Sequence, residues 1–158
     1  MNLALESPDQ PDVIALIEAL DAYQDGLYPP ESRHALDLRV LVQPHVLFAV
    51  ARDAHGAAVG CGAVVLQASA GELKRMYVSP AARGQGVGRS LIERLAHEAL
   101  QRGCRVLRLE TGPYQPEALG LYAACGFARR GPFGAYADDP LSVFMEKALV
   151  TAPAADRA

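Results

Sequence analysis

The stretch Arg83-Gly84-Gln85-Gly86-Val87-Gly88-Arg89 decides the fold, because it joins a predicted strand to a predicted helix. Glycine lets the backbone adopt unusual dihedral angles and lets a ligand approach the main chain closely. The first N–H groups of a helix have no partner inside it, and they lie at the positive end of the helix dipole. Arg83 and Arg89 can add charge-assisted hydrogen bonds to a diphosphate. The segment therefore predicts a site for a phosphate-bearing cofactor.

The residues on either side of this glycine loop (residues 83–89) have different periodicities. Residues 72–78 predict a strand that ends at Ser79-Pro80. After the loop, the apolar residues recur in steps of three and four up to Arg102-Gly103, which predicts an amphipathic helix. The apolar residues of that helix are Val87, Leu91, Ile92, Leu95, Ala96, Ala99 and Leu100.

The rest of the chain divides into short strands and helices bounded by Gly and Pro. The pattern predicts strands at 2–6, 46–52, 57–66, 106–110, from 126 onward and at 141–147. It predicts helices at 11–26, from 30 toward Pro44, and at 116–124. This order predicts an α/β fold with a mixed sheet and helices on its faces.

Composition limits the class of protein. The 158 residues suit one domain, which we expect at 1–149, with 150–158 as a disordered tail. The net charge of −3 argues against a nucleic-acid partner. No stretch is apolar enough for a membrane span or a signal peptide, so we expect a cytoplasmic protein. Three separated cysteines predict neither a disulfide framework nor a metal site.

The glycine loop fits three other interpretations less well. A dinucleotide-binding oxidoreductase needs G-x-G-x-x-G, but Arg89 stands where the third glycine belongs, although Glu110 lies near the position of a ribose-binding acid. A Walker loop needs Lys-Ser or Lys-Thr after the glycines, and neither is present. A loop that binds nothing is a third alternative, but three glycines in five residues carry an entropic cost without a ligand.

Two motifs resemble those of the GNAT N-acetyltransferase superfamily. Arg83-x-x-Gly86-x-Gly88 is similar to its acetyl-coenzyme A signature, [QR]-x-x-G-x-[GA]. Residues 118–127, with Tyr122 and Gly126-Phe127, resemble the family segment A-x-x-x-Y-x-x-x-G-F. The resemblance covers residues 1–149 and implies the GNAT fold. That fold is a mostly antiparallel sheet of six to seven strands with splayed central strands and about four flanking helices.

The resemblance implies acetyl-coenzyme A (acetyl-CoA) as co-substrate, with no metal. Backbone groups at the end of the 72–78 strand would hold the pantetheine arm, and the glycine loop would hold the diphosphate. Gln115 stands where the family usually has a pantetheine-binding Asn, and its side chain is one methylene longer. The implied cofactor-binding residues are Met76, Tyr77, Val78, Arg83, Gly84, Gln85, Gly86, Val87, Gly88, Arg89, Gln115 and Tyr122.

The resemblance also implies catalytic roles. Tyr122 falls at the position of a tyrosine that protonates the leaving thiolate. Glu72 resembles the general base of one branch of the family, and Glu110 is a second candidate. Simple alternation would put Glu72, Lys74, Met76 and Val78 on the same face of their strand.

The expected acceptor is a primary amine on a small molecule. Arg33 or Arg75 would favour an amino acid-like acceptor, because arginine binds carboxylates. The candidate acceptor residues are Tyr28, Glu31, Arg33, His34, Arg75, Glu110, Tyr136, Asp138 and Asp139, of which Asp138 or Asp139 would instead favour an amine or polyamine. Many family members pair, so a homodimer is a further option. An acyl-coenzyme A-sensing module without turnover remains the alternative from another class.

Overall fold

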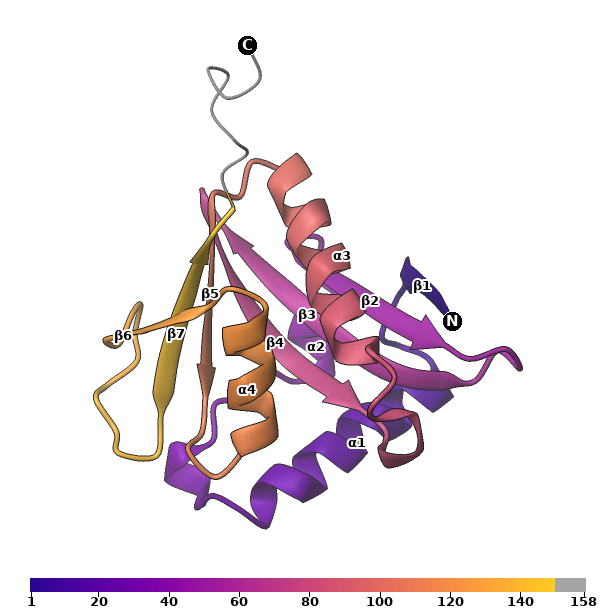
Figure 1. The fold of residues 1–158 in the computed structure, drawn as a ribbon, viewed down its shortest axis with the longest axis horizontal. Coiled ribbons are helices and arrows are strands. Elements are labelled where there is room, and N and C mark those ends of the chain that lie inside the picture. Colours follow the sequence, from indigo (N-terminus) through magenta and orange to yellow (C-terminus); the bar gives the residue numbers. More distant parts are fainter. Residues whose placement is uncertain (150–158) are drawn as a thin grey trace.

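The computed structural model describes residues 1–149, so the expected tail at 150–158 lies outside the described residues. A seven-stranded sheet has the order β1-β2-β3-β4-β5-β7-β6, and only the β4–β5 pair is parallel (Figure 1). The strands are β1 Asn2–Leu5, β2 Val46–Arg52, β3 Ala58–Gln67, β4 Ala70–Val78, β5 Val106–Thr111, β6 Ala128–Arg130 and β7 Val143–Ala148. The α-helices are α1 Pro11–Asp25, α2 Leu38–Leu41, α3 Val87–Gln101 and α4 Pro116–Ala124. The predicted fold class is confirmed.

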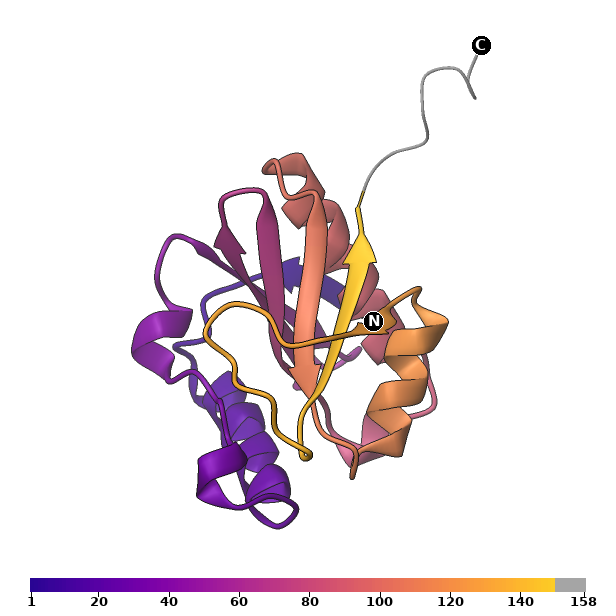
Figure 2. The ribbon, with the colours of Figure 1, turned by 90° about the vertical axis from the view of Figure 1, so that its left-hand side faces the viewer.

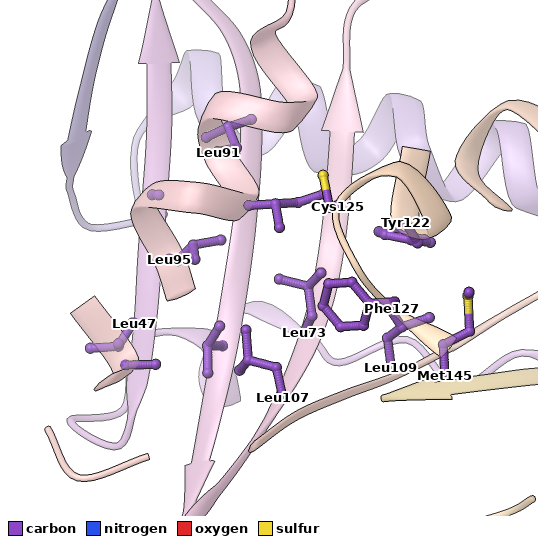
Figure 3. Packing of buried hydrophobic residues seen from close by; sticks show 14 of the residues in the cluster. Leu47, Leu73, Leu91, Leu95, Leu107, Leu109, Tyr122, Cys125, Phe127 and Met145 are labelled. Carbon is purple, nitrogen blue, oxygen red and sulfur yellow. The ribbon is translucent and has the colours of Figure 1, made fainter. Parts of the chain in front are cut away.

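The sheet is covered on both faces by helices. Figure 2 shows α1 and α2 on one side of the sheet and α3 and α4 on the other. The apolar stripe predicted for α3 is buried, and Leu91 and Leu95 are fully inaccessible in the same cluster as the sheet residues Leu107 and Leu109 (Figure 3). A second cluster, which includes Val13 of α1 and Phe48 of β2, fills the opposite face. Burial on both faces explains why β2 and β3 are apolar almost throughout.

The parallel pair of strands separates before either strand ends. Ala70 to Leu73 pair with Val106 to Leu109, and there the β4–β5 pairing stops. β4 continues to Val78 beside β3, while β5 continues to Thr111 beside β7. The two central strands therefore splay apart, as the resemblance implied, and α4 follows directly after β5.

A β-bulge lies in β4 at the point where the strands separate. Cys61 pairs with Tyr77 and Ala63 with Lys74, so β4 carries one extra residue against β3. Arg75 lies in this bulge with a φ of 59°. Met76 and Val78 consequently pack with the α3 cluster, whereas Lys74 and Glu72 contact Tyr136 on the opposite side. The expectation that these four residues share one face is wrong, because the extra residue reverses the alternation.

The predicted helix from 30 toward Pro44 is also wrong. The segment forms a 3₁₀ turn at Pro30–Ser32 and the single helical turn of α2. Arg33 between them is extended, because its guanidinium binds Asp21 and Asp25 of α1. The Asp37 side chain then caps α2 by accepting from the N–H of Val40 at 3.2 Å.

Within residues 1–149, the helices are too short or too polar to cross a membrane.

Candidate active site

Two cavities meet beneath α4. The larger, of about 430 Å³, extends from the glycine loop along the free end of β4. The smaller, of about 100 Å³, lies between β4, the end of β5 and the segment after α1. Both cavities are lined by Leu20, Met76, Gln115, Ala118 and Tyr122. A ligand in each would thus contact the same tyrosine.

The glycine loop forms one end of the larger cavity. Gly84 and Gly86 each have a φ of 78°, a conformation that is strained for residues with a side chain. Gly86 is also the N-cap of α3. The first α3 hydrogen bond runs from the Ser90 N–H to the Gly86 carbonyl. The preceding N–H groups, at residues 87–89, therefore have no partner within the helix and face the position of an anion.

Both arginines of the loop line the larger cavity, and each also donates a hydrogen bond to a backbone carbonyl group. Arg83 donates from Nε to the Val78 carbonyl at 3.0 Å, and its guanidinium carbon lies 5.7 Å from the centroid of the Tyr77 ring. Arg89 donates to the Ala124 carbonyl at 3.0 Å. Every cofactor-binding residue predicted from the sequence lines this cavity except Gln85, whose amide turns back to the Ala81 carbonyl at 3.4 Å.

Tyr122 lies in α4 where the cavities join. Its side chain is buried and packs edge-on against Phe127, with ring centroids 5.9 Å apart. Burial raises the pKa of its phenol, and the nearby Cys125 and Glu110 act in the same direction. The hydroxyl therefore carries its proton at neutral pH and can donate it.

Glu110 lies at the end of β5 and lines the smaller cavity. Burial raises the pKa of this carboxyl to about 7, and the negative charges of Glu72 and Asp139 add to the rise. The ammonium group of Lys74 opposes it. A carboxyl with a pKa near 7 suits a general base, because both protonation states are populated at neutral pH.

Glu72, the first candidate for the base, lies outside both cavity linings. Its carboxylate accepts from the Lys74 ammonium at 3.2 Å and from the Tyr136 hydroxyl. Lys74 also donates to the same hydroxyl at 2.7 Å. The contacts of Glu72 are those of an anchoring group, and the position of Glu110 is better suited to a base.

The other acceptor residues predicted from the sequence are only partly brought together. Tyr28, Arg33 and Arg75 line the smaller cavity with Glu110. Glu31 is exposed and lines neither cavity. Asp139 stands behind the cavity wall, where it accepts from the Ser32 hydroxyl at 2.8 Å and joins the β6–β7 loop to the segment after α1.

Lys74 lines the smaller cavity but was absent from the residues predicted for the site. The composition offered one signal, because Lys74 is one of only two lysines among the 15 basic residues of the chain. His34, another candidate acceptor residue from the sequence, lines the same cavity. Among residues 1–149, no group of three or more His, Cys, Asp or Glu side chains could hold a metal ion.

The splayed strands and the glycine loop at the start of α3 can hold a phosphate-bearing donor. The model of the acetyltransferase (GNAT) family matches residues 13–127, so the chain belongs to the GNAT acetyltransferase family. It is an acetyl-CoA-dependent N-acetyltransferase.

Individual relatives agree with this assignment. IAA acetyltransferase of Azospirillum brasilense is 52% identical over 151 residues, which cover 94% of this chain and 98% of that protein. The crystal structure of a candidate acyl-CoA N-acyltransferase from Klebsiella pneumoniae is 42% identical, covers 94% of this chain and 97% of its own, and superposes with a TM-score of 0.81. An aminoglycoside 6′-N-acetyltransferase complexed with coenzyme A shares the fold at a TM-score of 0.74 and 18% identity, over 97% of this chain and 99% of its own.

Proposed function

We propose that this enzyme transfers the acetyl group of acetyl-CoA to the primary amine of a small molecule held in the smaller cavity. The observation that carries the proposal is that Tyr122 lines both cavities. A donor in the larger cavity and an acceptor in the smaller one would meet at this residue. Direct attack then needs no covalent intermediate on the enzyme.

Acetyl-CoA fits the larger cavity by its chemistry. Its diphosphate would accept hydrogen bonds from the N–H groups of the glycine loop, where Arg83 and Arg89 add positive charge. Its pantetheine arm would lie against the free edge of β4 at Met76, Tyr77 and Val78, as an added strand does. The Gln115 side chain makes no capping bond to α4, so its amide can serve the arm.

The residues where the two cavities meet can supply and accept every proton that the reaction moves. The amine nitrogen attacks the thioester carbonyl carbon, a C–N bond forms, and the C–S bond breaks. Glu110 takes the proton of the amine, while Tyr122 gives its proton to the departing sulfur. The proton on Glu110 then passes back to the Tyr122 phenolate. The bulge leaves Arg75 and Met76 outside the regular β3 pairing, so the Met76 N–H can stabilise the oxyanion.

Among small amines, an amino acid-like acceptor is favoured because Lys74 and Arg75 line the smaller cavity. The name of the Azospirillum relative adds IAA to the compounds worth testing.

The proposal is tested by mixing the protein with acetyl-CoA and a panel of amines while following the free thiol of coenzyme A. The panel contains amino acids, polyamines, aminoglycosides, peptides and IAA, and mass spectrometry identifies the product. We expect thiol release that requires both the protein and a small amine. Tight binding of acetyl-CoA with no release above the buffer rate for any compound would instead indicate a binding module.

A further inference from the structure

We infer that the acceptor is a compact amino acid whose carboxylate is bound by Lys74 and Arg75 while its amine faces Glu110. This inference rests on the proposed function, because it assigns the smaller cavity to the acceptor. It adds a specificity-determining site on β4 and an orientation of the acceptor between β4 and the end of β5.

The β-bulge creates this site. In a regular strand, consecutive side chains point to opposite faces. Lys74 and Arg75 are consecutive, yet both line the smaller cavity, because Arg75 occupies the bulge with a φ of 59°. The strained residue thus places two cations side by side on one wall of the cavity.

Arg75 keeps a donor for a ligand. Its side chain is 3% exposed, and its Nε has no hydrogen-bond partner among the described residues. Its Nη2 donates to Asp21 at 2.9 Å and to the Ile17 carbonyl at 3.3 Å, which fixes the guanidinium. A buried donor without a partner costs free energy, so a carboxylate that satisfies it gains that free energy on binding.

The charge around Arg75 is only partly neutralised. Asp21 pairs with Arg75 at 2.9 Å and also with Arg33 at 3.0 Å, so two guanidinium groups share one carboxylate. Asp25 pairs with Arg33, but its side chain is 67% exposed, so solvent screens its charge. Asp21 alone therefore does not neutralise both guanidinium groups.

Lys74 supplies the second cation in a fixed position. Its ammonium has three N–H donors, of which two reach Glu72 and Tyr136. Lys74 and Glu72 are each 12% exposed, and Tyr136 holds both through its hydroxyl. Glu72 offsets the charge of Lys74, but the third N–H remains for a carboxylate, and little side-chain entropy is lost on binding.

The end of β5 suits an amine. Glu110 and Tyr122 line the same cavity, and Glu110 lies within the electrostatic reach of Lys74. The amine and carboxylate of an α-amino acid are bonded to one carbon atom, which matches a base at the end of β5 and cations on the neighbouring strand β4. The cavity has about a quarter of the volume of the larger one, about 100 Å³ against 430 Å³, which favours a compact acceptor.

The test compares each amino acid with the amine that lacks its carboxylate: glycine with methylamine, alanine with ethylamine, and serine with ethanolamine. Thiol release gives kcat/KM for each member, and the readout is the ratio within a pair. We expect the amino acid to be preferred by about tenfold or more in at least one pair, as one charge-assisted contact provides.

Lys74→Met should lower this ratio by about tenfold, and Lys74→Arg should restore part of it. Arg102→Met, at the far end of α3 where Arg102 pairs with Glu98, is the matched control and should keep the wild-type ratio. Circular dichroism of each variant verifies the fold.

Two results would overturn the inference while leaving the proposed function intact. One is turnover in which the amines match or exceed their amino acids, or in which only polyamines, aminoglycosides or peptides react. The other is a preference for amino acids that Lys74→Met leaves unchanged. No turnover with any amine would instead count against the proposed function itself, and with it against this inference.

Discussion

At the scale of single residues, Tyr122 is the point on which the chemistry depends. Tyr122→Phe removes the hydroxyl but keeps the ring that packs on Phe127. We expect kcat to fall about 100-fold, the lower range for a general acid, with little change in acetyl-CoA affinity. Thiol release and calorimetry measure the two quantities separately.

The matched control for that variant is Tyr114→Phe, because Tyr114 is 53% exposed and lines neither cavity. It should keep the wild-type kcat. Equal kcat values for the wild type and Tyr122→Phe would remove Tyr122 from the mechanism.

Glu110 and Glu72 can be separated by their pH profiles. If Glu110 is the base, it works when deprotonated, so kcat/KM should rise with pH through a midpoint near 7, the pKa of its carboxyl. Glu110→Gln should lose that midpoint and about 100-fold in rate. Glu72→Gln should keep it. A midpoint near 7 that survives in Glu110→Gln but disappears in Glu72→Gln would reverse the two roles.

At the scale of elements, the glycine loop has a conformation that only glycine adopts without strain. Gly86 has a φ of 78°, and a Cβ atom added there would have no other atom within 4 Å. Gly86→Ala is therefore opposed by backbone strain rather than by a steric clash. We expect it to lower the free energy of unfolding by about 1–2 kcal/mol and to weaken acetyl-CoA binding.

Gly120 provides the contrasting case, because it lies inside α4 with open space around its Cβ and no positive φ. Gly120→Ala should raise the free energy of unfolding by about 0.5–1 kcal/mol, since alanine is the better helix former. Urea denaturation measures both variants. Equal effects of the two substitutions would contradict the role of backbone conformation at Gly86.

The sequence predicted the elements that local patterns control. The stripe of α3, the β4 strand and the glycine loop all follow from periodicity and glycine spacing. The bulge at Arg75 could not be predicted, because no glycine marks its positive φ and its cause lies in pairing with β3 and in the contact with Asp21. The missing helix after Pro30 has a similar origin, since Arg33 is held by residues of α1.

The candidate site was predictable to a similar extent. The larger cavity is lined by Arg83, Gly86 and Gly88 of the first motif and by Ala118 and Tyr122 of the second, but not by Gly126 or Phe127. The contacts of the smaller cavity join distant segments: Tyr136 meets Glu72 across 64 positions, and Ser32 meets Asp139 across 107. No local pattern encodes such contacts, which is why Lys74 was missed.

At the scale of the whole molecule, Glu110 links stability to pH. Its folded pKa of about 7 exceeds the ordinary value of 4.5, so the folded protein keeps this proton at pH values where the unfolded chain has lost it. Stability therefore falls as pH rises from about 4.5 to about 7 through this group. Glu110→Gln cannot ionise and lacks this loss.

The measurement is the difference in unfolding free energy, Glu110→Gln minus wild type, at a series of pH values. We expect the difference to grow in favour of the variant from pH about 4.5 to about 7 and then to stay level. A difference that is constant or shrinks across this range would contradict the raised pKa.

The central claim is that donor and acceptor occupy separate cavities that meet at Tyr122. A crystal structure of the protein with coenzyme A tests it most directly. We predict the diphosphate about 2.7–3.2 Å from N–H groups of the glycine loop, and the sulfur beside the Tyr122 hydroxyl at the junction of the cavities. A diphosphate bound elsewhere, or a sulfur that ends away from Tyr122, would contradict the account.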